Sequence, residues 1–244
     1  MLRNSLEIPI GDESSVSSGN SNEVCVTDHR GKIRERVGDM IFEYDASSFF
    51  QNNNSVLVPL VSYVKQAIFP CDNVDTSSTP FTPPTHLVDT YCGAGLFAIM
   101  LSPYFSKIAG IELSKDSIAA ATNNASLNHL SEGKITFRSG DAAQIFDSVS
   151  DFPPASTAVI IDPPRKGCDD NFLDQLLNFR SSTVVYVSCN VHTQARDVGV
   201  LLRKSAEEVE EGQKKGKYVL ESIRGFDLFP QTAHVESVAV LRLV

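Results

Sequence analysis

The chain has 244 residues and a mass of 26.6 kDa, with 42% apolar and 21% charged residues. These values are typical of one globular domain, or one domain with an appendage, that buries a sizeable core. The 21 Lys and Arg residues against 30 Asp and Glu give a net charge of −9, which argues against a generally basic nucleic-acid coat. No window reaches the ~18 consecutive apolar residues of a membrane span, so we expect an intracellular protein with no membrane association.

The cysteines do not form a recognisable framework. Their number is odd and no pair has CxxC spacing, which argues against a disulfide scaffold or a zinc cage. We therefore expect no bound metal and treat each cysteine as a lone thiol. The five are Cys25, Cys71, Cys92, Cys168 and Cys189.

The first 45 residues differ in composition from the rest. Residues 11–22 are small and polar, which predicts a mobile loop. Two extended runs around the DHRG turn then predict a hairpin or strand pair over Glu23–Asp45, resembling the end of a domain whose beginning is absent. We interpret residues 1–45 as a flexible segment with the remnant of a preceding domain, and residues 46–244 as the principal domain.

The principal domain alternates apolar runs with amphipathic stretches. Residues 55–69 have helical spacing, with Ser55 or Asn54 as the expected N-cap, and a polar loop follows. From His86 onward the alternation predicts βαβ units and a mainly parallel, buried sheet. Residues 217–243 contain two strand-like runs with no helix between them, which predicts an antiparallel hairpin at the sheet edge. This α/β, Rossmann-like pattern is typical of class I S-adenosylmethionine (SAM) methyltransferases.

Three strand ends indicate a nucleoside-cofactor site. Glycines of the VDTYCGAG turn, Gly93 among them, let backbone amides approach a cofactor. Glu112 ends the next apolar run, where a carboxylate can accept both ribose hydroxyls. Asp141 ends the third, where this fold class contacts the adenine side. Each feature alone also fits a structural turn or a solvated acid, but their series favours the site.

The sequence IIDPPRKG brings polar groups to the same crevice. An apolar strand delivers Asp162, and two prolines then fix the backbone in an extended turn. Arg165 and Lys166 would supply a local positive field for phosphate despite the negative net charge.

Two later motifs carry the candidate reactive groups. Cys189 in VVYVSCN is expected at the tip of a parallel strand, where a helix N-terminus around Thr193 would lower its pKa. His234 and Glu236 are expected to enter the final strand and, two residues apart, to face the substrate together. A carboxylate at the start of an apolar strand must be solvated, paired or functional.

The motifs occur in a characteristic order: SSFFQNN, TYCGAG, GIELSKDSIAAATNNASLNH, DPPRKG, YVSCN and FPQTAHVE. Over roughly residues 38–244 they resemble the catalytic domain of RNA 5-methyluridine methyltransferases, most closely the fungal tRNA (uracil-5-)-methyltransferases. The resemblance implies SAM-dependent methylation of C5 of uridine in tRNA, at uridine-54 of the T loop. We also expect the protein to be a monomer.

The same resemblance implies a role for individual residues. Cys189 would add to C6 of uracil, and Glu236 would remove the C5 proton after methyl transfer. Four positions match those that bind SAM in the family: Gln51, Tyr91, Glu112 and Asp162. We assign substrate contacts to Arg165, Phe50 and His234.

The chain departs from the family at three points. The family's glycine loop usually has Asn at the positions of Ala94 and Leu96, the N-terminal RNA-binding domain is missing, and so are the iron–sulfur cysteines of some members. We therefore expect a fragment of a longer protein.

Two alternatives remain. An RNA cytosine-5 methyltransferase shares the addition at C6, but that family has a cysteine where this chain has Arg165. A non-catalytic module that binds SAM and tRNA, acting as an RNA chaperone, is the other.

Overall fold

The computed structural model describes residues 3–6, 23–26, 28, 31–70, 82–140 and 145–244. The loop expected at 11–22 and most of the loop after the first long helix lie outside these residues. No helix among the described residues is long and apolar enough to cross a bilayer. Within the same residues, no three His, Cys, Asp or Glu side chains gather as a metal site would require.

A central sheet organises the described chain. Its strand order is β10-β11-β9-β8-β5-β6-β7. From β5 the chain adds β6 and β7 on one side, and it then returns to the other side of β5 to add β8 and β9. Such a switch point opens a crevice at the carboxyl ends of the strands. The parallel strands are β5 (His86–Thr90), β6 (Lys107–Glu112), β7 (Ile135–Ser139), β8 (Thr157–Ile161) and β9 (Thr183–Ser188).

The sheet closes with the expected antiparallel hairpin. β11 (Glu236–Leu243) lies between β9 and the edge strand β10 (Tyr218–Phe226), and it pairs antiparallel with both. β11 is buried over its first six residues, as its apolar run requires. The predicted mainly parallel sheet with a C-terminal antiparallel hairpin is thus confirmed.

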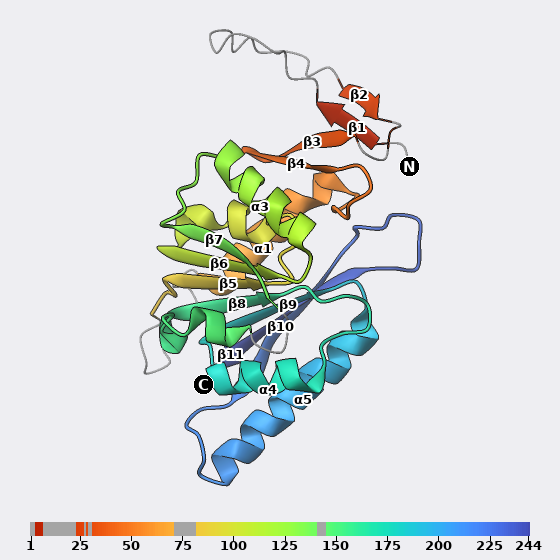
Figure 1. The fold of residues 1–244 in the computed structure, drawn as a ribbon. Helices are drawn as coiled ribbons and strands as arrows, with labels where there is room; N and C mark the ends of the chain where they lie inside the picture. The colour runs from red at the N-terminus through yellow and green to blue at the C-terminus, as the bar shows by residue number, and fades with distance from the viewer. Residues whose placement is uncertain (1–2, 7–22, 27, 29–30, 71–81, 141–144) are drawn as a thin grey trace.

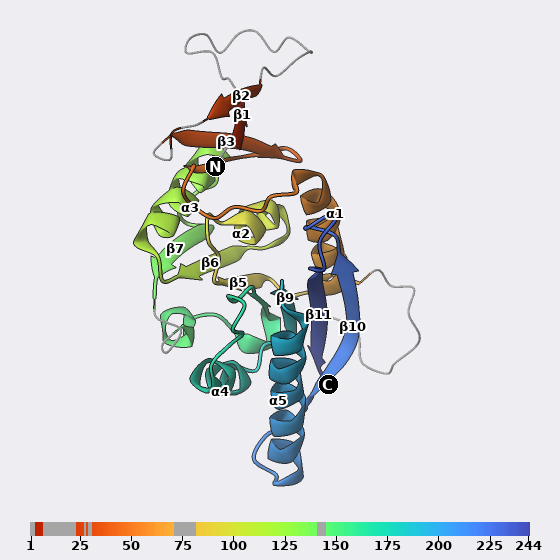
Figure 2. The same ribbon diagram turned by 90° about the vertical axis from the view of Figure 1, so that its right-hand side faces the viewer.

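Helices cover both faces of the sheet (Figures 1 and 2). α1 (Asn54–Ile68), α2 (Leu96–Met100) and α3 (Lys115–Leu127) share one hydrophobic cluster with one face. α4 (Asp170–Phe179) and α5 (Val191–Glu210) share a second cluster with the other. The α1 N-cap is Asn53 rather than Ser55 or Asn54, because the helix already begins at Asn54, and no side chain caps it.

The N-terminal strands pair differently from the expectation. β3 (Lys32–Val37) and β4 (Met40–Asp45) form a hairpin. Its turn lies at Gly38, whose φ of +58° favours glycine. β2 (Glu23–Val26) pairs with β1 (Arg3–Leu6) instead, so the hairpin predicted to turn at DHRG is wrong in its pairing.

The β3–β4 hairpin packs on the principal domain. Ile33, Val37, Phe42 and Tyr44 point to one side because strand side chains alternate, and all four lie in the hydrophobic cluster of α1 and α2. The boundary placed at residue 45 stays a prediction, with the hairpin in contact with the domain that follows.

We predict opposite stability effects for two Gly-to-Ala substitutions. A Cβ on Gly110 of β6 would lie 2.3 Å from a ring carbon of Phe137, so Gly110→Ala should lower the free energy of unfolding by about 1–3 kcal/mol. Gly199→Ala, in the exposed interior of α5 with no atom within 4 Å of the new Cβ, should raise it by roughly 0.5–1 kcal/mol. Urea unfolding measures both, and an equal effect of the two would contradict the packing described.

Candidate active site

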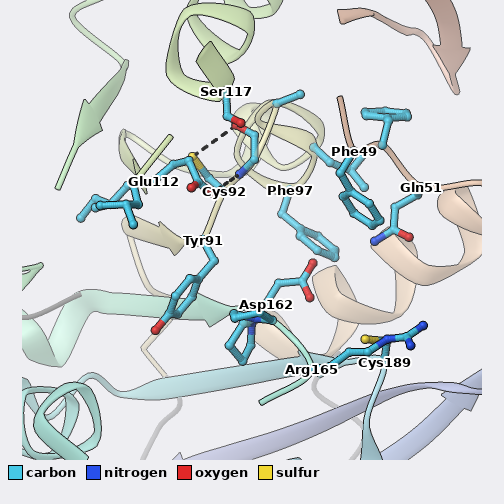
Figure 3. A pocket seen from close by; sticks show the side chains of 18 of the residues that line it. Phe49, Gln51, Tyr91, Cys92, Phe97, Glu112, Ser117, Asp162, Arg165 and Cys189 are labelled. Atoms are coloured by element: carbon cyan, nitrogen blue, oxygen red, sulfur yellow. Dashed lines mark hydrogen bonds between the residues drawn. The ribbon is translucent and has the colours of Figure 1, made fainter. Parts of the chain in front are cut away.

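A cavity of about 720 Å³ lies at the carboxyl ends of the parallel strands (Figure 3). It brings together residues that are widely separated in the sequence. Of the residues predicted for the site, those that line the cavity are Phe50, Gln51, Tyr91, Gly93, Glu112, Asp162, Arg165, Cys189 and Glu236.

The glycine loop, residues 91–95, forms one wall of the cavity. Tyr91, Gly93 and Gly95 have positive φ angles of 59°, 52° and 88°, so the loop turns sharply between β5 and α2. The Cys92 amide donates to the Ile111 carbonyl at 3.1 Å, which fixes the loop against β6. No atom lies within 4 Å of a Cβ built on Gly93. The backbone there is open to a close approach from the cavity.

Glu112 is oriented by two backbone amides. One carboxylate oxygen accepts from the Gly93 amide at 3.3 Å, and the other accepts from the Ser114 amide at 3.0 Å. Each oxygen keeps a second lone pair for a donor in the cavity. The side chain is therefore preorganised to accept two further hydrogen bonds, as a ribose diol would supply.

The segment before α1 forms another wall. Phe50 is buried and stacks on Tyr44 of β4, with ring centroids 4.5 Å apart, while Gln51 next to it is also buried. Phe49 is 73% exposed and lines the cavity. Phe50 therefore has a packing role, whereas Phe49 offers an accessible ring surface at the cavity.

The pairing of β9 with β11 places Cys189 opposite Glu236. In this antiparallel ladder Ser188 pairs with Ser237, so the next residue along β9 and the preceding residue on β11 face one another. Both line the cavity. Gln194 reinforces this junction by donating from its buried amide to the carbonyls of Tyr186 and Ser237, at 2.7 and 3.1 Å.

Two carboxyl groups, the buried Glu236 and the partly buried Asp162, line the cavity. Burial raises the pKa of Asp162 to about 7. Burial, and then the charge of Asp162, raise the pKa of Glu236 to about 8. Glu236 is 2% exposed, which accounts for the large shift. A carboxyl group with such a pKa can both accept and release a proton near neutral pH.

Cys189 is half-buried, and its pKa is raised rather than lowered. The causes are burial first and the charge of Glu236 second, while a hydrogen bond from Arg165 opposes them. The expected lowering of this pKa is wrong, because burial and then the charge of Glu236 raise it. In Figure 3 Arg165 and Cys189 lie side by side, and Asp162 points into the cavity.

The DPPRKG loop, residues 162–167, is held by the first turns of α5. The Arg165 carbonyl accepts from the Asn190 amide at 2.9 Å and from the Thr193 hydroxyl at 3.2 Å. Arg196 donates to the Lys166 carbonyl at 3.0 Å. These bonds tie the loop to the helix that follows Cys189.

Asp197 also ties α5 to the segment that follows the DPPRKG loop, and the sequence motifs did not identify it. Its buried carboxylate accepts from the Cys168 amide, the Tyr186 hydroxyl and the Arg196 guanidinium, at 2.8, 2.7 and 2.7 Å. Gly167 leaves room for it, since an added Cβ would lie 2.6 Å from the carboxylate. The signal available in the sequence was an aspartate on the apolar face of an amphipathic helix.

One predicted site residue, His234, does not line the cavity. His234 is exposed, and β11 begins only at Glu236, so the expected strand alternation of the two is wrong. The His234 ring contacts Phe229 instead, with centroids 6.1 Å apart. Asp141 lies outside the described residues.

Residues 23–243 match the family model of the tRNA (uracil-5-)-methyltransferases. The chain belongs to this family. It is 46% identical over 225 residues to the tRNA (uracil(54)-C(5))-methyltransferase of Schizosaccharomyces pombe, covering 90% of this chain and 39% of that protein. The Saccharomyces cerevisiae protein of the same name is 43% identical over 222 residues, covering 91% and 32%. The chain thus spans two fifths or less of these relatives.

A solved structure agrees with this family. The Pyrococcus abyssi tRNA (uracil-54, C5)-methyltransferase, in complex with S-adenosyl-L-homocysteine, superimposes with a TM-score of 0.65 and 29% identity, over 95% of this chain and 48% of that one. The resemblance indicated by the sequence motifs is confirmed.

The electrostatics of Cys189 predict how its reactivity responds to pH. Because the Glu236 charge raises the thiol pKa, Glu236→Gln should shift the alkylation midpoint of Cys189 to lower pH. Arg165→Gln should shift the midpoint to higher pH, because the guanidinium lowers the pKa. Iodoacetamide labelling from pH 7 to 10, followed by mass spectrometry of the Cys189 peptide, measures both. Shifts of the same sign would contradict the arrangement.

Proposed function

We propose that this chain transfers a methyl group from SAM to C5 of uridine in tRNA, at uridine-54 of the T loop. The observation that carries the proposal is the opposition of Cys189 and Glu236 across the β9–β11 ladder, inside a cavity that also contains a nucleoside-type site. The names of the fungal relatives supply the substrate.

The residues around the glycine loop fit SAM. The open backbone at Gly93 suits a close approach, and both Glu112 oxygens are aimed by amides, so their free lone pairs suit the ribose hydroxyls. Gln51, Tyr91 and Asp162 line the same cavity and would bind the remainder. When bound, SAM supplies an electrophilic methyl group on a sulfonium centre.

Cys189 would activate the base by covalent addition. C5 of uracil is a poor nucleophile, but a thiolate bond to C6 converts the ring into an enolate whose C5 carbon attacks the methyl group. The Arg165 side chain next to the thiol favours the thiolate form against the burial and the acid that disfavour it. Cysteine also leaves readily at the end of the reaction.

Glu236 would remove the C5 proton after methyl transfer. The proton moves to the carboxylate, the C5–H electrons re-form the C5–C6 double bond, and the thiolate departs. A pKa of about 8 suits this task because the group holds and releases a proton near physiological pH. Asp162 lines the same cavity and is the next candidate for the base.

The base must leave its stack to reach the cavity, at a cost of a few kcal/mol. The exposed ring of Phe49 and the loop residues Arg165 and Lys166 lie at the cavity. With a net charge of −9, RNA affinity depends on such local basic groups, to which we add Arg196 and Arg224. Monomeric state and intracellular location stay predictions.

The two alternative functions make different predictions. An RNA cytosine-5 methyltransferase would yield 5-methylcytidine, and the position where that family has a cysteine is Arg165 here. A non-catalytic module would bind tRNA and labelled SAM without forming 5-methyluridine. Incubation with unmodified tRNA and nucleoside analysis separates these outcomes.

Substitutions of Cys189 and Glu236 should block different steps. Cys189→Ala should abolish covalent RNA capture and methyl transfer together, because no enolate forms without addition at C6. Glu236→Gln should still add and methylate, but it should accumulate a methylated protein–RNA adduct because the C5 proton stays in place. Denaturing gels with methyl-labelled SAM measure both.

Two results would contradict these roles. They are normal turnover by Glu236→Gln and adduct formation by Cys189→Ala. Gly199→Ala is the matched control, since this exposed helix position is remote from the pocket lining, and it should methylate tRNA at the wild-type rate.

A further inference from the structure

Two asparagines, Asn124 in α3 and Asn128 at the C-cap of that helix, bind the outer edge of β4. They are one helical turn apart, so they lie on the same face of the helix. Asn128 accepts from the Ile41 amide at 2.9 Å and donates to the Ile41 carbonyl at 2.7 Å. Asn124 accepts from the Glu43 amide at 2.7 Å. The two side chains therefore continue the hydrogen-bonding pattern of β4 in place of another strand.

Asn124 alone of this pair also contacts the glycine loop. Its amide nitrogen donates to the Ala94 carbonyl at 3.0 Å, and the side chain is fully buried. One carboxamide thus joins the β3–β4 hairpin through its oxygen and the loop through its nitrogen. Asn128 makes its other hydrogen bond to the Asn124 carbonyl, within the helix.

The contact falls at a sensitive point of the loop. Ala94 lies between Gly93 and Gly95, both of which have positive φ. Its neighbours on both sides are therefore glycines, which have the widest range of backbone conformations. The Gly93 amide on the other side of Ala94 is the one that orients Glu112. Fixing the Ala94 carbonyl therefore limits rotation of the backbone that faces the cavity.

We propose that Asn124 is a positioning residue that couples docking of the β3–β4 hairpin to ligand binding at the glycine loop. When the hairpin packs on α3, the Glu43 amide orients the Asn124 side chain so that it can bind the Ala94 carbonyl. When a ligand orders the glycine loop, the Ala94 carbonyl orients the same side chain so that it can bind the Glu43 amide. By thermodynamic linkage the two events strengthen one another equally. The identity of the ligand rests on the proposed function; the connection itself rests on the hydrogen bonds of Asn124.

The test compares Asn124→Ala with Asn128→Ala in the whole chain. Asn124→Ala loses one hydrogen bond to β4 and Asn128→Ala loses two, but only Asn124→Ala loses the bond to the glycine loop. Calorimetric titration with S-adenosyl-L-homocysteine should show roughly tenfold weaker binding by Asn124→Ala and near wild-type binding by Asn128→Ala. Thermal unfolding should show that both are destabilised, which separates positioning from stability.

A second measurement on the wild-type chain covers the case in which Asn124→Ala fails to fold. S-adenosyl-L-homocysteine should slow amide hydrogen exchange of the β4 peptide, although β4 lies on α3 rather than in the central sheet. Unchanged β4 exchange, or equal ligand affinity in the two variants, would overturn the coupling alone. Absence of any binding by the wild type would overturn the proposed cofactor, and with it the coupling.

Discussion

The antiparallel pairing of β11 with β9 is the constraint on which the site depends. A cysteine at the end of a parallel strand and a glutamate at the start of the last strand meet only because Ser188 pairs with Ser237. A shift by one residue would move Glu236 to the other face of the sheet. Gln194 bonds to carbonyls on both strands and so protects this register. The fold supplies the register, and the register brings together the proposed nucleophile Cys189 and the proposed base Glu236.

This arrangement disfavours the ionised forms of the side chains in the site. Burial and the charge of Asp162 disfavour the ionised form of Glu236, and burial and the charges of Glu236 and Asp162 disfavour the Cys189 thiolate. The Arg165 side chain favours the Cys189 thiolate instead. The side-chain amide of Asn190 holds the loop that contains Arg165. The two carboxyl groups, with pKa values of about 7 and 8, therefore change protonation near neutral pH, as a group that removes a proton requires, whereas the pKa of the Cys189 thiol is raised.

The sequence predicts the parts of this site that depend on local pattern. Apolar runs ending at Glu112, Asp162 and Cys189 locate strand ends, and the carboxyl ends of parallel strands meet at one edge. Pairing partners of short strands are not local, which is why β2 was assigned to the wrong strand. The long-range bonds of Asp197 and Asn124 could not be predicted either, because they depend on how helices sit on loops distant in sequence. The predicted direction of the thiol pKa shift was wrong for the same reason, because both the burial of Cys189 and the charge of Glu236, 47 positions away, depend on the tertiary fold.

The central claim is that Cys189 is the nucleophile placed by the β9–β11 register. Trapping with tRNA containing 5-fluorouridine tests it most directly, because fluorine at C5 cannot leave as a cation and the covalent adduct persists. Protease and nuclease digestion followed by tandem mass spectrometry should locate a methylated fluorouridine on the peptide that contains Cys189. Attachment at Cys92, which also lines the cavity, or a complete lack of adduct in the presence of SAM, would contradict the account.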